Sequence, residues 1–265
     1  MKCSPETMLL YAVTDRAWTG RQTLYRQVEQ ALKGGVTCVQ LREKELDGEA
    51  FLAEAKEIGA LCRAYGVPFI VNDSVEIALE CGADGVHVGQ SDMAVGQVRA
   101  LAGGRLMIGV SARTVEQALR AREAGADYLG VGAVFGTSTK PDAQAISHQT
   151  LKDICAAVDI PVVAIGGISR DNIPELSGTG VDGVALVSAI FAAEDIEGRC
   201  RELKELVTFS LKKTVLTGVT KKSTSFSREK KKQKERARFQ SGRSSLCCTS
   251  ATETNITNER EGAKR

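Results

Sequence analysis

The 265-residue chain is 43% hydrophobic and 26% charged, with a formal net charge of +2, which suffices for one barrel-sized domain or two small ones. The charge is uneven, since residues 207–265 hold 15 Lys and Arg against 5 Asp and Glu, a net of +10, and residues 1–206 hold 20 against 28, a net of −8. No apolar run reaches the roughly 18 residues of a membrane span and the first residues lack a secretory pattern, so we expect a cytoplasmic protein without a membrane partner.

Eight short β-rich runs alternate with amphipathic helical patterns between residues 8 and 193. In chain order the runs are LLYAV near residue 9, TCVQL at 37, PFIV at 68, GVHV at 85, LMIGV at 106, YLGVG at 128, PVVAI at 161 and GVALV at 183. Strands that alternate with helices predict a parallel sheet covered on its faces. Eight such units predict an α/β fold of the (β/α)8 or TIM-barrel type, with the active site on the loops that follow the strands.

A weak internal repeat supports this prediction. Four segments place a glycine at the end of a helical pattern, just before a strand, at Gly35, Gly82, Gly125 and Gly180. Glycine is the usual residue that ends a helix. The spacing between these glycines corresponds to about two βα units each.

Cysteine and histidine usage indicates no metal or redox centre. The eight cysteines are scattered except for Cys247 and Cys248, none forms a C-x-x-C pair, and the two histidines lie far apart. Such spacing favours buried, reduced thiols.

The periodic pattern stops beyond residue 207. We therefore predict a barrel domain over residues 1–206 and a polar, basic, disordered tail over residues 207–265 that is dispensable for folding and activity. The alternative is a tail that binds nucleic acid, but its aromatic residues are limited to Phe226 and Phe239, so disorder is the simpler interpretation.

Polar residues collect where the predicted strands end. The strand near residue 37 is followed by Gln40, Arg42 and Lys44, which share one face if the strand persists and then point at one target, such as an anion. The alternative is a solvated strand end that leads into the next helix. The later strands end at Asn72 and Asp73, at Gln90 and Asp92, at Ser111, at Thr137 to Lys140, at Gly166 and Gly167, and at Val187 and Ser188.

Two of these groups predict ligand chemistry. Asp73 and Asp92 offer hard oxygen ligands that suit Mg²⁺, whose shell is usually shared with substrate phosphates, although each aspartate is also placed to cap a helix. Gly166 and Gly167, with the backbone after the last strand, fit the recurrent phosphate site of such barrels, although the two glycines also fit a simple tight turn.

Together these residues resemble the thiamine phosphate synthase family. The motifs in order are QLREK (Gln40 to Lys44), ND (Asn72, Asp73), GVHVGQSD ending at Asp92, IGVS ending at Ser111, GTSTK (Gly136 to Lys140), AIGGI and ALVSAI. The resemblance covers about residues 8–193 and leaves the tail without a counterpart. It implies a Mg²⁺-dependent transferase of thiamine biosynthesis that condenses 4-amino-2-methyl-5-(diphosphooxymethyl)pyrimidine with a thiazole phosphate, through a dissociative route, to give thiamine phosphate and diphosphate.

The resemblance also assigns residue roles. It implies that the pyrimidine diphosphate is bound by the segment Gln40, Leu41, Arg42, Glu43 and Lys44 together with Asn72, Ser111 and Lys140, of which Arg42, Ser111 and Lys140 are the catalytic set. It assigns the thiazole phosphate to Thr137, Ser138, Thr139, Gly167, Val187 and Ser188, and Mg²⁺ to Asp73 and Asp92. Glu43 fits poorly beside a diphosphate, and we expect it to form a salt bridge with a nearby cation.

Two other functions stay open at this point. A thiazole tautomerase, an isomerase on a similar barrel, does not need the diphosphate-binding residues, and a noncatalytic barrel would bind phosphorylated ligands without reaction. The sequence leaves open whether the protein forms a homo-oligomer.

Overall fold

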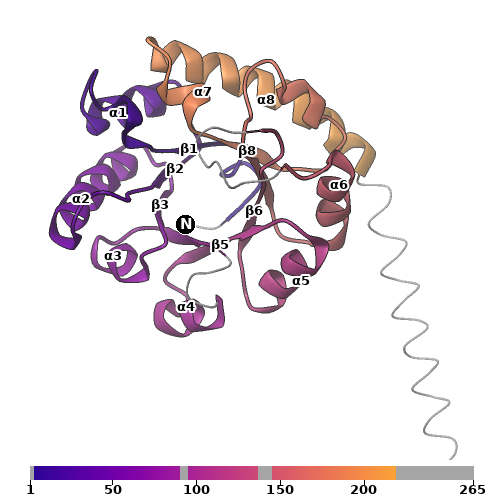
Figure 1. Ribbon diagram of the computed structural model, residues 1–265, viewed down its shortest axis with the longest axis horizontal. Coiled ribbons are helices and arrows are strands. Elements are labelled where there is room, and N and C mark those ends of the chain that lie inside the picture. Colours follow the sequence, from indigo (N-terminus) through magenta and orange to yellow (C-terminus); the bar gives the residue numbers. More distant parts are fainter. Residues whose placement is uncertain (1–2, 90–94, 137–144, 219–265) are drawn as a thin grey trace, which may run out of the picture. The chain divides into compact units, whose positions relative to one another are not determined.

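Eight parallel strands close into a barrel whose order follows the chain, and β8 pairs back with β1 (Figure 1). The computed structural model describes residues 3–89, 95–136 and 145–218, with side chains described as far as residue 211. The strands are β1 (Leu10–Val13), β2 (Cys38–Leu41), β3 (Phe69–Asn72), β4 (Gly85–Val88), β5 (Met107–Ala112), β6 (Tyr128–Gly132), β7 (Val162–Ile165) and β8 (Gly183–Leu186). Each predicted strand is present, so the TIM-barrel prediction is confirmed.

Helices surround the barrel on the outside (Figure 1). They are α1 (Leu24–Lys33), α2 (Gly48–Ala64), α3 (Val75–Glu80), α4 (Val95–Ala102), α5 (Val115–Glu123), α6 (His148–Ala157), α7 (Ser188–Phe191) and α8 (Ile196–Gly218), with short 3-10 helices η1 (Arg16–Trp18) and η2 (Ile173–Leu176). The link between β7 and β8, which is described throughout, contains η2 and no α-helix. Pro174 lies in this turn and cannot donate a backbone hydrogen bond.

Side-chain caps fix where five of the helices begin. In each of five helices the capping oxygen accepts a hydrogen bond from the amide three residues later, which satisfies a backbone donor that the helix itself leaves free. These caps are Thr23, Asp47, Ser74, Thr114 and Ser147.

The internal repeat has a physical cause. The four glycines identified from the sequence all adopt a positive φ, between 67° and 96°, which other residues rarely adopt. Two residues after each glycine comes a side chain that accepts a hydrogen bond from the first or second amide of the preceding strand in the barrel. These residues are Thr37, Asp84, Asp127 and Asp182.

The core has two layers. The larger layer lies between the strands and the helices, and a smaller cluster that includes Tyr11, Ile70 and Tyr128 fills the barrel interior. The six cysteines within the described part of the chain are free thiols, as expected, and burial raises the pKa of Cys62 and Cys200 to about 12.

The predicted domain boundary at residue 206 falls inside α8 and needs correction. This helix continues to Gly218, packs on α1 and η2, and buries Val207, Ser210 and Leu211. The compact unit therefore ends at Gly218. The sequence pattern misled because only a few apolar positions, Val207 and Leu211 among them, separate residue 206 from the basic run that begins at Lys212. The predicted disorder of the tail beyond this helix lies outside the described residues.

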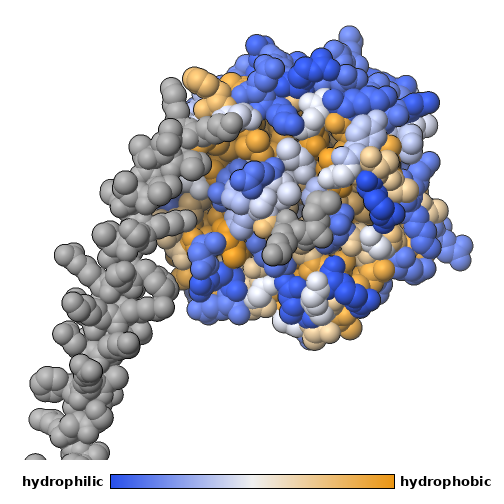
Figure 2. Space-filling model, turned by 180° about the vertical axis from the view of Figure 1, so that it is seen from behind, coloured by the Kyte–Doolittle hydropathy of each residue, from blue (hydrophilic) through white to orange (hydrophobic). Residues whose placement is uncertain are grey.

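Hydrophilic and apolar side chains share the visible surface of the molecule (Figure 2). Figure 2, which shows the face behind that of Figure 1, has hydrophilic side chains over most of its edge and smaller apolar areas between them. Within the described ranges, no helix is long and apolar enough to cross a membrane.

Candidate functional site

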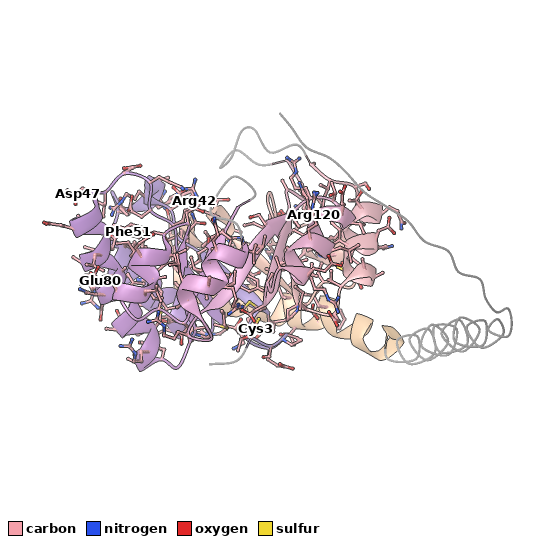
Figure 3. The ribbon with its side chains drawn as sticks, turned by 90° about the horizontal axis from the view of Figure 1, so that it is seen from below. Cys3, Arg42, Asp47, Phe51, Glu80 and Arg120 are labelled. Atoms are coloured by element: carbon pink, nitrogen blue, oxygen red, sulfur yellow. The ribbon has the colours of Figure 1, made fainter. Side chains whose placement is uncertain are left out.

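The carboxyl ends of the strands meet at one mouth of the barrel. In Figure 3, Arg42 and the α2 cap Asp47 lie on the upper side of the molecule, and Cys3 lies on the lower side. Since parallel strands all end at the same face, side chains far apart in sequence come together there.

The side chains at the end of β2 and just after it lie in three environments. The strand ends at Leu41, so the alternation expected as far as Lys44 does not continue as strand. Gln40 points into the barrel, where its Nε2 donates to the Tyr11 hydroxyl at 2.8 Å. Leu41 packs in the outer core, which leaves only its main chain near the mouth. Arg42 lies at the rim, where its Nη1 donates to Asp15 Oδ2 at 3.2 Å.

Glu43 holds the loop from inside. Its Oε1 accepts hydrogen bonds from the amides of Lys44 at 2.7 Å and Glu45 at 2.6 Å, and its carboxylate pairs with Arg16. The expected salt bridge is thus present, with a cation 27 positions earlier in the chain. Burial by itself would raise the pKa of the Glu43 carboxyl, but the backbone amides and the Arg16 guanidinium outweigh it and hold the pKa below its ordinary value. Glu43 therefore anchors the loop that carries Arg42 and Lys44.

Lys44 and Asp73 meet across neighbouring loops. The Lys44 ammonium pairs with Asp73 Oδ2, and the two side chains are 51% and 33% exposed. Asp73 has φ +65°, a left-handed conformation that is uncommon outside glycine, and its amide donates to the His87 carbonyl at 2.8 Å. Ser74, and not Asp73, caps α3, so the capping alternative for Asp73 is not supported.

A line of hydrogen bonds crosses the barrel just below the mouth. Ser111 Oγ lies 3.0 Å from His87 Nε2, and His87 Nδ1 lies 3.1 Å from the Tyr128 hydroxyl. The Tyr128 hydroxyl lies 2.8 Å from that of Tyr11, which in turn accepts from Gln40. Two residues predicted to bind the same substrate, Gln40 and Ser111, are thus joined through three interior side chains.

The glycine turn after β7 is closely packed. Gly166 and Gly167 have φ +97° and +63°, and a Cβ on Gly167 would lie 2.8 Å from the Phe135 carbonyl carbon. Asn172 stabilises the turn, since its Nδ2 donates to the Gly167 carbonyl at 2.9 Å. After β8, Val187 leads directly into α7, which begins at the exposed Ser188.

Five predicted site residues lie outside the described part of the chain. They are Asp92, Thr137, Ser138, Thr139 and Lys140.

The donor set at the mouth is compatible with Mg²⁺. Asp73 offers a partly exposed carboxylate beside a cationic side chain, and Mg²⁺ commonly takes one or two carboxylates and completes its shell with water and substrate phosphate. Among the described residues no cluster of three or more His, Cys, Asp or Glu side chains forms a complete protein cage for a metal. A shared metal and phosphate shell suits such a sparse carboxylate set.

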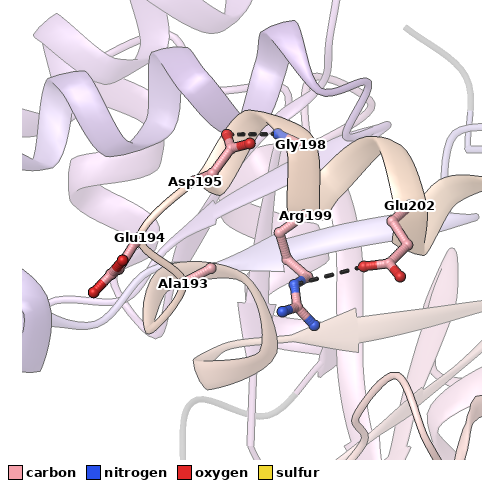
Figure 4. A pocket seen from close by; sticks show the side chains of 6 residues that line it. All are labelled: Ala193, Glu194, Asp195, Gly198, Arg199 and Glu202. Carbon is pink, nitrogen blue, oxygen red and sulfur yellow. Dashed lines mark hydrogen bonds and ion pairs between the residues drawn. The ribbon is translucent and has the colours of Figure 1, made fainter.

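A shallow pocket beside the start of α8 does not suit a phosphorylated ligand. It is lined by Ala193, Glu194, Asp195, Gly198, Arg199 and Glu202 (Figure 4). Asp195 accepts from the Gly198 amide at 2.8 Å, and Arg199 is paired with Glu202. Three carboxylates surround one neutralised guanidinium there, so an anion would be repelled.

Several contributors to the mouth were not identified from the sequence. Asp15 and Arg16 follow β1 and hold Arg42 and Glu43, while Tyr11, His87 and Tyr128 form the line beneath them. Period-two alternation along β1, β4 and β6 could have placed the last three inside the barrel. The pairings of Asp15 and Arg16 depend on loop conformation, which carries no such period.

The comparisons with known proteins agree with one another. The family model described as thiamine monophosphate synthase matches residues 10–190. A thiamine-phosphate synthase of Clostridioides difficile is 50% identical over 203 residues, 77% of this chain and 94% of the relative. One of Clostridium acetobutylicum is 48% identical over 198 residues, with 75% and 94% covered. The solved thiamine phosphate pyrophosphorylase of Pyrococcus furiosus aligns with a TM-score of 0.73 at 40% identity, covering 78% of this chain and 98% of that one.

Proposed function

Because the chain belongs to the thiamine monophosphate synthase family, we propose that it joins a hydroxymethylpyrimidine diphosphate to a thiazole phosphate, forming thiamine phosphate and releasing diphosphate. The family assignment rests on a match over most of the barrel and on relatives near 50% identity. The roles of individual residues below are proposals that the geometry of the mouth supports.

The pyrimidine diphosphate binds over the ends of β2, β3 and β5. Arg42 and Lys44 neutralise the diphosphate, since each is held at the rim by a carboxylate rather than buried. Lys140 completes this cationic set. Gln40, Asn72 and Ser111 bind the uncharged part of the substrate.

The reaction requires charge stabilisation more than proton transfer. The aminopyrimidine ring releases electrons into its methylene carbon, so the bond to the diphosphate oxygen breaks and both electrons leave with the diphosphate. The thiazole nitrogen then supplies its lone pair to the resulting cation, and the new carbon–nitrogen bond completes thiamine phosphate. Fixed cations around the leaving group lower the barrier because its negative charge grows as the bond breaks.

Mg²⁺ is the cofactor that this arrangement suits. Asp73 and Asp92 would hold the ion, and when bound it would neutralise part of the diphosphate charge. Binding would require Lys44 to share or release the Asp73 carboxylate, which an exposed ion pair allows at small cost.

The thiazole phosphate binds on the opposite part of the rim. The Gly166–Gly167 turn and the start of α7 offer main-chain amides rather than charged side chains, and such amides bind phosphate well. Gly167, Val187 and Ser188 take this role together with Thr137, Ser138 and Thr139.

One observation carries the proposal most strongly. The barrel brings Lys44, assigned to the pyrimidine diphosphate, to Asp73, assigned to Mg²⁺, and links Gln40 to Ser111 through interior side chains, which supports one site for this substrate. A thiazole tautomerase does not need the two cations Arg42 and Lys44 at this rim. A noncatalytic barrel does not need Asp73.

A direct assay separates the three functions. The purified protein is incubated with Mg²⁺ and either both substrates or the thiazole phosphate alone, and the products are separated by chromatography. Synthase activity yields thiamine phosphate and diphosphate in equal amounts only when both substrates are present. Isomerised thiazole without thiamine phosphate would support the tautomerase, and bound but unchanged substrates would support a noncatalytic barrel.

A further inference from the structure

Three consecutive residues after β1 each hold the segment that follows β2. Thr14 Oγ1 accepts a hydrogen bond from the Arg42 amide at 3.0 Å, and Asp15 Oδ2 accepts one from Arg42 Nη1 at 3.2 Å. Arg16, the next residue, pairs with Glu43. The proposed reaction uses none of these three residues, so their contacts need another explanation.

Arg16 lies between two carboxylates. Its Nε donates to Glu43, and its Nη2 lies 2.9 and 3.0 Å from the two carboxylate oxygens of Glu54 on α2. The Glu43 and Glu54 side chains are only 1% and 16% exposed. The guanidinium therefore joins the loop after β2 to the helix that follows this loop.

Glu43 passes this support on to the main chain of the loop. One of its carboxylate oxygens faces Arg16, and the other accepts hydrogen bonds from three successive amides of the loop. These amides belong to Lys44, Glu45 and Leu46. The position of the Glu43 carboxylate therefore sets the path of the backbone that carries the Lys44 ammonium.

The helix η1, on which the guanidinium begins, is itself held in place. Asp15 Oδ1 caps it and accepts from the Ala17 amide at 3.0 Å. The buried Gln27 of α1 donates to the carbonyls of Trp18 at 3.1 Å and Gln22 at 2.9 Å. The support thus reaches from α1 through η1 to the loop after β2.

Stability alone does not account for this network. Pairing seldom returns the free energy that is lost when charges leave water, so a buried ion pair often contributes less stability than apolar side chains of similar size. Burial raises the pKa of the Glu54 carboxyl even with the Arg16 guanidinium beside it, so its charge is held at a cost. What such a network provides is a fixed geometry, which a binding site needs behind the side chains that touch the ligand.

We propose that Arg16 is a positioning residue, which holds the loop of residues 42–46 in the conformation that a diphosphate binds. Glu54 shares this role because it fixes the second side of the guanidinium. Arg42 and Lys44 then meet the anion without rearrangement. A flexible loop would have to be ordered on binding, and that cost reduces affinity. This inference rests on the proposed function for the identity of the ligand, but the support of the loop by Arg16 does not.

The support of the loop can be measured without any ligand. Arg16→Met removes the charge and keeps an unbranched side chain. We expect faster hydrogen exchange in this variant at the amides of residues 44–46, which the Glu43 carboxylate holds in the wild-type protein. Exchange measured by NMR at the wild-type rate would overturn the proposal.

A second arginine provides the matched control. Arg99 donates to the Leu106 and Gly125 carbonyls at 3.1 and 2.8 Å and pairs with Asp127, all of which precede the strands β5 and β6. Its side chain is 31% exposed, against 24% for Arg16. Arg99→Met therefore removes a comparable network at the opposite end of the barrel. We expect it to lower the melting temperature and to leave exchange at residues 44–46 unchanged.

The effect on binding is measured by calorimetry with inorganic diphosphate and Mg²⁺. We expect the Kd of Arg16→Met to rise about tenfold, the factor for one lost hydrogen bond of typical net strength, and that of Arg99→Met to stay at the wild-type value. Arg16→Lys keeps the charge but not the planar fork that bridges both carboxylates, so its Kd should rise less. Faster exchange without a change in Kd, or an equal rise in Arg16→Met and Arg99→Met, would contradict the positioning role.

These measurements separate the inference from the proposed function. A protein that makes no thiamine phosphate, but loses diphosphate affinity in Arg16→Met alone, supports the positioning role and counts against the synthase. An active synthase in which Arg16→Met binds diphosphate as tightly as wild type overturns the positioning role and leaves the function standing. Where Arg16→Met does not fold, Arg16→Lys decides, and wild-type affinity in that variant overturns the proposal. A wild-type protein without affinity for diphosphate overturns it as well.

Discussion

Lys44 and Asp73 are adjacent because their strands are neighbours in the barrel, and their ion pair is too exposed to contribute much stability. A role in ligand binding explains the pair better. We predict that Lys44→Ala raises the KM for the pyrimidine diphosphate roughly 10- to 100-fold, the range for one charge-assisted hydrogen bond. The KM for thiazole phosphate and the melting temperature should hardly change.

A lysine outside the mouth provides the control for this prediction. Lys56 on α2 is similarly exposed and pairs with Glu80 at 3.8 Å, so Lys56→Ala removes a comparable charge away from the proposed site. Steady-state kinetics of both variants give the KM for the pyrimidine diphosphate, which tests the prediction. Equal KM values for the two variants would remove Lys44 from the diphosphate site.

Glu43 acts on the same loop from inside the protein. Its pKa is held below the ordinary value, so its contribution to stability is present at neutral pH and is lost as the pH falls below about 4. We predict that Glu43→Gln lowers the melting temperature at pH 7 and that the difference from wild type shrinks as the pH approaches 3. Glu45→Gln, at the exposed neighbouring position, should melt like wild type throughout. A difference that is constant with pH would show that the charge of Glu43 does not hold the loop.

At the scale of the strand, β5 depends on a glycine that leaves room for two rings. Gly109→Ala places a methyl group against Tyr128 and His87, and overpacking of this kind costs about 1–3 kcal/mol. We predict a lower free energy of unfolding and a weaker affinity for the pyrimidine diphosphate. Gly96→Ala in α4, where no atom lies within 4 Å of the added Cβ, should instead be neutral or stabilising. Urea unfolding of both variants tests this, and equal stabilities would contradict the packing argument.

At the scale of the helix, α8 determines where the folded unit ends. A chain that stops at residue 206 loses Val207 and Leu211, which are 0% and 4% exposed. Burying such side chains contributes about 1.5–3 kcal/mol each. We predict that truncation after residue 206 lowers the free energy of unfolding by about 3 kcal/mol or more, while truncation after residue 218 leaves it unchanged. Equal stability of the two truncated chains would show that the last turns of α8 do not belong to the core.

For the whole molecule, sequence periodicity was sufficient for the barrel but not for its contacts. The eight strands follow from β-rich runs, which burial on both faces imposes, and from helix-ending glycines, which the positive φ requires. Residues at strand ends could be grouped for the same reason, since every strand ends at one mouth. The partners of Arg42 and Glu43 could not be predicted, because Asp15 and Arg16 reach them through an irregular loop. The end of α8 was missed because its last buried apolar positions, Val207 and Leu211, are few and are followed directly by a basic run.

We propose above that one mouth of the barrel, built from the ends of β2, β3 and β5, binds the pyrimidine diphosphate. A crystal structure of the protein with thiamine phosphate, diphosphate and Mg²⁺ tests it most directly. We expect the pyrimidine ring against Gln40 and Ser111, and the diphosphate beside Arg42 and Lys44 with the metal ion at Asp73. Products bound elsewhere, such as in the acidic pocket beside α8, would contradict it.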